Sequence, residues 1–195
     1  MSVRESNKLR TRRALADSAV SLFSEHGYDS ITMADVAAAA GVSRRTAFRY
    51  FPAKDELLLD YSKRWMDVFD ESVETNKALP VGERLRVASH AIADHIEQDP
   101  EPLRRAFALV STHPAIAAKY AAGNQAWIDR VAAEISGGLE TTPEVVVRSR
   151  VLASAFMGMI DSVCMLWADG DQAMGPLLDH GCDILAPSFR RSATS

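Results

Sequence analysis

Two short helix-forming segments joined by a glycine turn limit the fold of this 195-residue chain more than any other feature. The first segment opens at Thr32 and has apolar residues at the i, i+3, i+4 and i+7 positions of one helix face, namely Met33, Val36, Ala37 and Ala40. Gly41 follows, where a tight turn between two helices needs a backbone that tolerates a positive φ. Ser43 is a suitable N-cap for the second segment, and Pro52 ends it because proline has no amide hydrogen. This order predicts a helix-turn-helix unit.

The second segment, Arg44–Phe51, is predicted to be a helix with a basic outer face. At 100° per residue the side predicted to pack inward holds Ala47, Phe48 and Phe51. The outward side holds Arg45, Thr46, Arg49 and Tyr50. A short face that is basic and rich in hydrogen-bonding groups suits duplex DNA. The alternative interpretation is a solvated charged helix in an ordinary bundle.

The charge of the chain is unevenly distributed. Residues 1–54 carry nine Lys and Arg against five Asp and Glu, whereas the remaining residues carry 13 against 21. The net charge of −4 therefore combines a basic N-terminal part with an acidic body. Such an arrangement favours docking of DNA phosphates on the N-terminal part only.

The run ADVAAAAGVSRRTAFRYFPAKDELL, residues 34–58, is similar to the DNA-binding signature of the tetracycline-repressor (TetR) family. In that signature an alanine-glycine-valine turn precedes a short recognition helix that ends in an aromatic-phenylalanine pair and a following lysine. The resemblance covers roughly the first third of the chain. It implies that phosphates are held by Thr32, Ser43, Thr46, Tyr50 and Lys54. It also implies that base edges are faced by Arg44, Arg45 and Arg49.

Two positions depart from the family pattern. Phe48 stands where the family commonly has tyrosine, so a hydroxyl contact to the DNA backbone is lost and Phe48 is expected to serve packing only. Met33 and Ala34 offer no bidentate hydrogen bonding at the start of the first helix of the motif. Base reading is therefore expected to depend on the second helix.

The rest of the chain is also predicted to be helical, so the expected fold class is all-α. A long first helix is predicted at residues 8–26, and its start is basic, with Lys8, Arg10, Arg12 and Arg13. This basic start either contacts the DNA, at the backbone or in a neighbouring minor groove, or is a solvated tail. Later helices are predicted at residues 55–76, 84–98, 103–111, 114–136, 145–167 and 171–185. The predicted domains are a three-helix DNA-binding domain at 1–54 and a larger helical effector-binding and dimerisation domain at 55–195.

The segment Val145–Trp167 is apolar nearly all round, which predicts burial on more than one side. A domain of this size would achieve that burial with the help of a second subunit. The expected homodimer pairs the helices at about 143–168 and 171–185 with their copies across a two-fold axis, an arrangement that the family resemblance also implies.

No catalytic or metal-ligating set is present in the sequence, so no enzymatic activity and no cofactor are expected. His90 and His95 are five residues apart and do not share a helix face, and Cys164 and Cys182 form no CxxC pair. The two cysteines are interpreted as free core thiols. No secretory signal and no membrane span are predicted, which favours a cytoplasmic protein without a membrane partner.

An effector site is the least constrained prediction. The candidate lining residues are apolar or aromatic side chains and one histidine, namely Trp65, Phe69, His90, Phe107, Trp127 and Met157. Side chains of this kind at helical spacing are also typical of plain core. The predicted function is a DNA-binding regulator, a homodimeric repressor of a palindromic operator that a small, mostly apolar effector releases. The alternatives are an effectorless dimeric DNA-binding or architectural protein and a helical enzyme that carries the motif.

Overall fold

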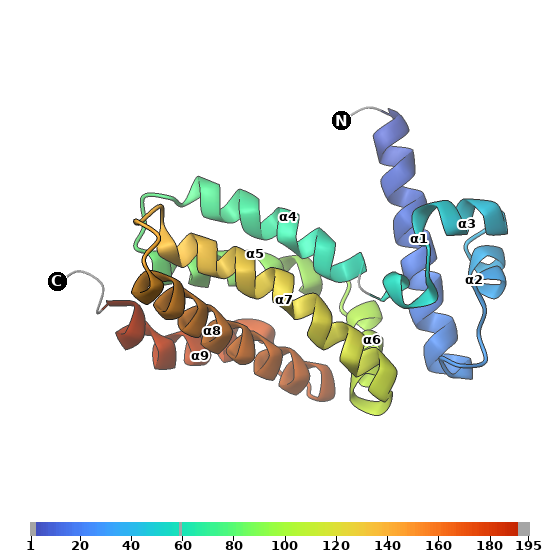
Figure 1. Ribbon diagram of the computed structural model, residues 1–195. Coiled ribbons are helices and arrows are strands. Elements are labelled where there is room, and N and C mark those ends of the chain that lie inside the picture. Colours follow the sequence, from blue (N-terminus) through green and yellow to red (C-terminus); the bar gives the residue numbers. More distant parts are fainter. Residues whose placement is uncertain (1–2, 59, 191–195) are drawn as a thin grey trace. The chain divides into compact units, whose positions relative to one another are not determined.

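The computed structural model describes residues 3–58 and 60–190, apart from the side chains of residues 3–5 and 61–63. Every regular element in these ranges is a helix (Figure 1). The contacts divide the chain into two compact units. The first contains Met1–Lys63 and Glu101–Tyr120, and the second contains Arg64–Pro100 and Ala121–Ser195.

The first unit contains the predicted helix-turn-helix. Its elements are α1 (Val3–His26), α2 (Met33–Ala39), α3 (Arg44–Tyr50), the 3-10 helix η1 (Lys54–Leu57), α6 (Glu101–Thr112) and the first turns of α4 (Asp60–Thr75) and α7 (Pro114–Ser136). Apolar side chains from α1, α2, α3, η1, α6 and α7 meet in one core, which includes Leu15, Phe23, Val36, Ala47, Phe51, Leu57, Leu109 and Ile116. Grouping by contacts thus differs from the division at residue 54 that the sequence predicts, because Leu109 and Ile116 share the core of α1–α3.

The second unit is a helical bundle made of α5 (Val81–Glu97), α8 (Pro143–Asp169), α9 (Met174–Arg190) and the remainders of α4 and α7. Its core includes Phe69, Leu85, Trp127, Val131, Ala153, Phe156, Met157 and Cys182. Polar pairs join the helices at the edge of this core. Arg84 lies 2.8 Å from Glu134, and the amide of Asn124 donates to Asp161 at 3.0 Å. Every helix that the sequence predicts beyond residue 54 is present, with ends that differ by a few residues.

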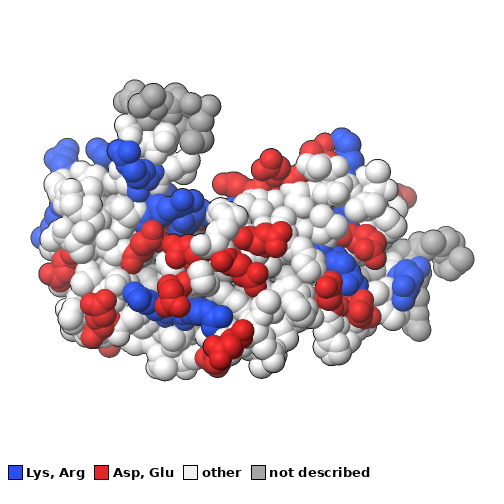
Figure 2. Space-filling model, turned by 180° about the vertical axis from the view of Figure 1, so that it is seen from behind, with Lys and Arg blue, Asp and Glu red and all other residues white. Residues whose placement is uncertain are grey.

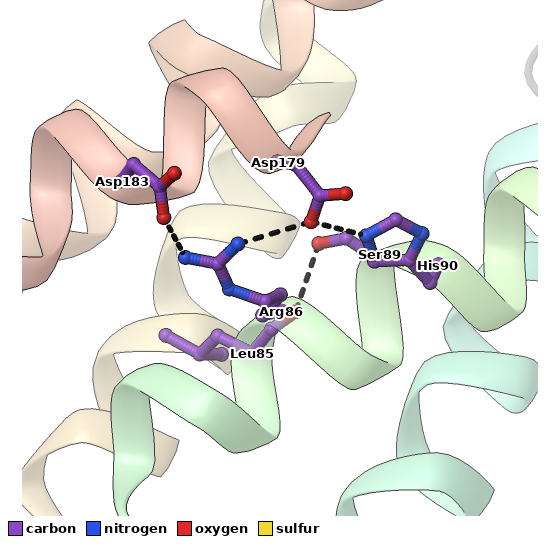
Figure 3. Close-up of polar contacts among 6 residues, drawn as sticks. All are labelled: Leu85, Arg86, Ser89, His90, Asp179 and Asp183. Carbon is purple, nitrogen blue, oxygen red and sulfur yellow. Dashed lines mark hydrogen bonds and ion pairs between the residues drawn. The ribbon is translucent and has the colours of Figure 1, made fainter. Parts of the chain in front are cut away.

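Helix α9 is attached to α5 by a charged network (Figure 3). The guanidinium of Arg86 donates to Asp179 at 3.0 Å and also to Asp183, and the Nε2 atom of His90 lies 3.0 Å from Asp179. These hydrogen bonds, from His90 first and then from Arg86, lower the pKa of Asp179, and the bond to Asp183 is the main reason that the pKa of Arg86 is raised. At the start of α9 the backbone amide of Met174 donates to Glu97 at 2.7 Å. One face of α9 is thereby fixed on α5.

Helix α8 has one covered face and one uncovered face. Ala153, Phe156, Met157 and Trp167 are buried, whereas Val147, Val151 and Leu166 are 61–63% exposed. The exposed positions continue through Gly158 and Ser162 at helical spacing. This helix has 27 residues and a mean hydropathy of 1.7 in its most apolar stretch, so by length and composition alone it could cross a membrane. Its buried face nevertheless packs in the core of the second unit, as in the core helix of a bundle.

Candidate nucleic-acid interface

Helix α2 begins with a complete capping box. The hydroxyl of Thr32 accepts the backbone amide of Asp35 at 3.3 Å, and the carboxylate of Asp35 accepts the backbone amide of Thr32 at 2.8 Å. The Thr32 hydroxyl also donates to this carboxylate at 2.6 Å. These hydrogen bonds favour the charged carboxylate and lower the pKa of Asp35. Thr32 is exposed, but its amide and hydroxyl are already occupied by the cap.

The turn between α2 and α3 depends on Gly41, whose φ is +68°. This is the left-handed region, which costs a residue with a Cβ about 1–2 kcal/mol. The amide of Gly41 donates to Ala38 at 3.1 Å and the amide of Val42 donates to Ala37 at 2.9 Å, so the last carbonyls of α2 are satisfied within the turn. Val42 packs against the core of the first unit. The turn therefore sets the angle at which α3 leaves α2.

Helix α3 is capped by Ser43, whose hydroxyl accepts the backbone amide of Thr46 at 3.1 Å and lies 2.9 Å from the Thr46 hydroxyl. Ala47 and Phe51 are fully buried and fasten the helix to the core. The cap, the turn and these two anchors confirm the helix-turn-helix geometry that the sequence predicts.

The prediction that Phe48 packs inward is wrong. Phe48 is 39% exposed, whereas Tyr50, predicted to point outward, is half-buried against the core. The reason is geometric. Measured around the helix from Ala47, Phe51 lies about 40° away and Tyr50 about 60° away on the other side, while Phe48 lies about 100° away. The core covers Ala47, Phe51 and part of Tyr50, and Phe48 lies farther round the helix, at the edge of the outer face.

Three arginines dominate the outer face of α3. Arg44, Arg45 and Arg49 are exposed, and among the described residues none of them is paired with a carboxylate. Arg44 lies over the ring of Phe48, and Arg49 lies over the ring of Tyr50, each at 5.4 Å from the ring centroid. These guanidinium groups have no internal counterion, so their charge is available to an external anion.

Lys54 lies in a different environment from the other predicted phosphate ligands. Its ammonium donates to the backbone carbonyls of Tyr28 at 2.6 Å and Ile31 at 2.9 Å. It also lies 3.9 Å from the centroid of the Tyr28 ring. These contacts close the segment between α1 and α2 over η1, and they favour a structural role for Lys54. The two carbonyls use two of the three N–H donors of the ammonium, so one donor is left for a phosphate.

A polar cleft of about 640 Å³ lies beside α3 in the same unit. Its lining residues come from the N-terminal half of α1 and the end of α3, and they are Asn7, Lys8, Thr11, Arg12, Arg49 and Tyr50. On the face drawn in Figure 2, Lys and Arg side chains gather around the N-terminal half of α1. The structure thus brings the basic start of α1 next to the predicted recognition helix, a proximity that no local sequence signal specifies.

The predicted effector residues are only partly brought together. Phe69, Trp127 and Met157 are buried in the core of the second unit, with Trp65 packed against it, and the rings of Phe69 and Trp127 meet edge to face at 5.6 Å. His90 belongs instead to the α5–α9 network. Phe107 lies in the first unit, where its ring contacts Tyr120 at 5.7 Å.

A cavity of about 410 Å³ in the second unit is lined by residues that the sequence interpretation missed. They come from the start of α5, from α8 and from the end of α9, and they are Pro80, Val81, Gly82, Glu83, Arg86, Phe156, Cys182, Ala186, Phe189 and Arg190. None of the six predicted effector residues belongs to this lining. Spacing along single helices carries no information on a cavity that three helices form jointly.

The described residues contain no group of three or more His, Cys, Asp or Glu side chains that could hold a metal ion. Cys164 and Cys182 are buried free thiols. Burial, with a smaller contribution from Asp161, raises the pKa of Cys164 to about 12, and burial likewise raises the pKa of Cys182. Both thiols are thereby kept in the protonated, weakly nucleophilic form.

The helical fold and the exposed arginines of α3 together define the class of this protein, which is that of helix-turn-helix proteins. A family model described as bacterial regulatory proteins, tetR family, matches residues 15–61, and one described as MftR C-terminal domain matches residues 79–190, more than half of the chain. The chain belongs to the tetR family of bacterial regulatory proteins.

Individual relatives are similar over unequal lengths. The transcriptional repressor LfrR of Mycolicibacterium smegmatis is 34% identical over 73 residues, which is 37% of this chain and 38% of that protein. The transcriptional activator FasR of the same species is 29% identical over 83% of this chain and 74% of its own length. Among solved structures, the repressor FadR of Thermus thermophilus, in complex with lauroyl-CoA, superposes with a TM-score of 0.57 at 24% identity, covering 91% of this chain and 94% of FadR.

Proposed function

We propose that this protein is a cytoplasmic transcriptional regulator that binds a palindromic DNA operator as a homodimer and is released by a small effector. The observation that carries the proposal is the outer face of α3, where three exposed arginines have no described carboxylate partner on a helix anchored by its cap and core residues. Uncompensated guanidinium groups on such a helix suit the major groove, where arginine binds guanine in a bidentate manner.

The residues of this face divide into two proposed roles. Arg44, Arg45 and Arg49 read base edges, while Thr32, Ser43, Thr46 and Tyr50 contact phosphates, as the sequence predicts, with Lys54 as the remaining predicted phosphate ligand. Exposed Phe48 joins the outer face. An aromatic ring at this position supplies an apolar contact of the kind that the 5-methyl group of thymine accepts.

Dimerisation is proposed through the uncovered face of α8 and the neighbouring part of α9. Exposed Val147, Val151, Leu166 and Ile184 are large apolar side chains that gain from burial, and Gly158 between them permits close approach of a second helix. A dimer would place two copies of α3 in successive major grooves, about 34 Å apart or somewhat more.

An effector site is proposed in the second unit. There are two candidate positions for this site. One is the cluster that part of the sequence-based set forms, with Trp65, Phe69, Trp127 and Met157, and the other is the cavity between α5, α8 and α9. The lauroyl-CoA of FadR supports an effector with an apolar body. The effector must bind the non-operator conformation more tightly, because equal affinity for both conformations shifts nothing. The proposed role is repression, the role of LfrR, whereas FasR is an activator.

A fluorescence-anisotropy titration against DNA from upstream of the protein's own gene tests the proposal. The expected result is saturable binding of a palindromic duplex, with Arg45→Ala losing about 1–3 kcal/mol and the preference at one base pair of each half-site. A cell extract of small metabolites should weaken the wild-type complex. Failure to bind any upstream duplex more tightly than scrambled DNA would contradict the regulator, and insensitivity to every extract would favour the effectorless alternative.

A further inference from the structure

Arg12 is one of the residues that line the cleft between α1 and α3, and it has two contacts with other side chains of the first unit. Its Nε atom donates to the carboxylate of Asp60, the first residue of α4. Its guanidinium carbon lies 4.6 Å from the centroid of the Phe51 ring. Phe51 itself is fully buried beneath α3. The plane of the guanidinium is therefore set by groups that belong to the core of the unit.

Asp60 is only 1% exposed, whereas Arg12 is 26% exposed. A carboxylate this deeply buried needs a cationic partner, because an uncompensated charge away from water is strongly destabilising. Arg12 supplies that partner with one edge of its guanidinium and still lines the cleft. Among the described residues no hydrogen bond to the Nη atoms of Arg12 is found. The other edge of the fork is thus left for a ligand.

The ligand that fits this edge is a phosphate. Two parallel N–H groups of one guanidinium match two oxygens of a phosphate, and the side chain binds more strongly when its rotamer is already fixed. Lys8 and Arg49 add two further positive charges to the lining, and Thr11 and Tyr50 add hydroxyl groups. The cleft contains no carboxylate of its own among its lining residues.

We propose that this cleft binds one phosphate of the DNA backbone through the Nη atoms of Arg12, and that Asp60 is the positioning residue that keeps Arg12 ready for it. The inference rests on the proposed DNA-binding function and assigns to it a phosphate site and a residue on which that site depends.

The experiment measures the affinity of the protein for a DNA duplex at a series of NaCl concentrations, for the wild type and for Arg12→Gln. The matched control is Arg13→Gln, because Arg13 is the neighbouring arginine, is exposed and does not line the cleft. Arg12→Gln should weaken binding by about tenfold near 0.1 M salt and lower the slope of log K against log[salt] by about 0.9, the value for one phosphate. Arg13→Gln should change both quantities less. Equal slopes for Arg12→Gln and the wild type would overturn the site.

The role of Asp60 is tested by Asp60→Asn, alone and combined with Arg12→Gln. The control is Asp55→Asn, since Asp55 pairs with Lys119 in the same unit. Asp60→Asn should weaken duplex binding several-fold in the wild-type background and not at all in the Arg12→Gln background. An equal loss in both backgrounds would refute positioning through Arg12. Circular dichroism checks that each variant is folded.

Arg12→Lys keeps the proposal testable if Arg12→Gln, which leaves the buried Asp60 carboxylate without this cationic partner, or Asp60→Asn does not fold. Lysine retains the charge opposite Asp60 but has no planar fork, so the folded variant should bind DNA less tightly than the wild type. Wild-type affinity in this variant would overturn the bidentate site. A wild-type protein that binds no duplex at all would instead refute the proposed function, and the two failures are thus distinguishable.

Discussion

Replacement of Lys54 by alanine separates a structural role from a phosphate contact. The ammonium of Lys54 donates to two backbone carbonyls, at 2.6 and 2.9 Å, and lies over the Tyr28 ring. The family resemblance instead implies that this ammonium holds a DNA phosphate. Lys54→Ala removes the ammonium in both cases, but the two roles affect different quantities.

The magnitude of the structural effect follows from these contacts. A hydrogen bond to a charged group contributes about 1.5–3 kcal/mol, and a cation over an aromatic ring adds about 0.5–1 kcal/mol at a partly exposed site. Water can reach part of the vacated space, because Lys54 is only half-buried, so the lower end of this range applies. We expect Lys54→Ala to lower the free energy of unfolding by about 2–4 kcal/mol.

Urea unfolding followed by circular dichroism measures this loss, and the salt dependence of duplex binding by the folded variant measures any phosphate contact. A structural Lys54 predicts a lower urea midpoint and an unchanged salt slope. Lys77→Ala is the matched control, since Lys77 forms only an exposed ion pair with Glu74 and should leave the midpoint nearly unchanged. An unchanged midpoint together with a salt slope lower by about 0.9 would refute the structural reasoning and restore the phosphate contact.

Four further outcomes are expected. If Phe48 packs on a thymine methyl group, replacing that thymine by uracil in the operator should weaken wild-type binding by about fourfold, the equivalent of one buried methyl group. The same replacement should leave binding by Phe48→Ala unchanged, and an equal loss in both proteins would place Phe48 away from the base. Gly158→Leu should give monomers in sedimentation, because Gly158 is the position that permits close approach of a second helix. No atom lies within 4 Å of a Cβ there, so the variant should still fold, and the control Ala126→Leu on α7 should remain dimeric. The hydrogen bonds that lower the pKa of Asp35 stabilise the fold above the usual aspartate value of 3.8, and this stabilisation is lost as the pH falls through the lowered pKa, so Asp35→Asn should flatten the loss of stability in urea titrations below about pH 4. Trp127→Ala should weaken effector binding in fluorescence titrations and leave effector-free operator affinity nearly intact; intact effector binding would direct attention to the cavity between α5, α8 and α9.

The helix-turn-helix was predictable from the sequence because its signals are local. Apolar spacing, the caps at Thr32 and Ser43, Gly41 in the turn and Pro52 after the second helix each act within a few residues of one another. The same local rules located the later helices. The family signature also lies in one continuous run, so it too could be recognised without knowledge of the fold.

Properties that depend on which segments meet were decided by the tertiary structure alone. Phe48 and Tyr50 have similar apolar surfaces, and the direction of the core, set by Ala47 and Phe51, decides which of them is exposed. Lys54 acquires its carbonyl partners 23 and 26 residues away in the chain, and Arg12 acquires Asp60 48 residues away. No periodicity specifies contacts at such separations, because they arise only when packing has brought distant segments together. A sequence thus reports the type and the faces of its helices, whereas the partners of its charged side chains follow from how those faces are covered.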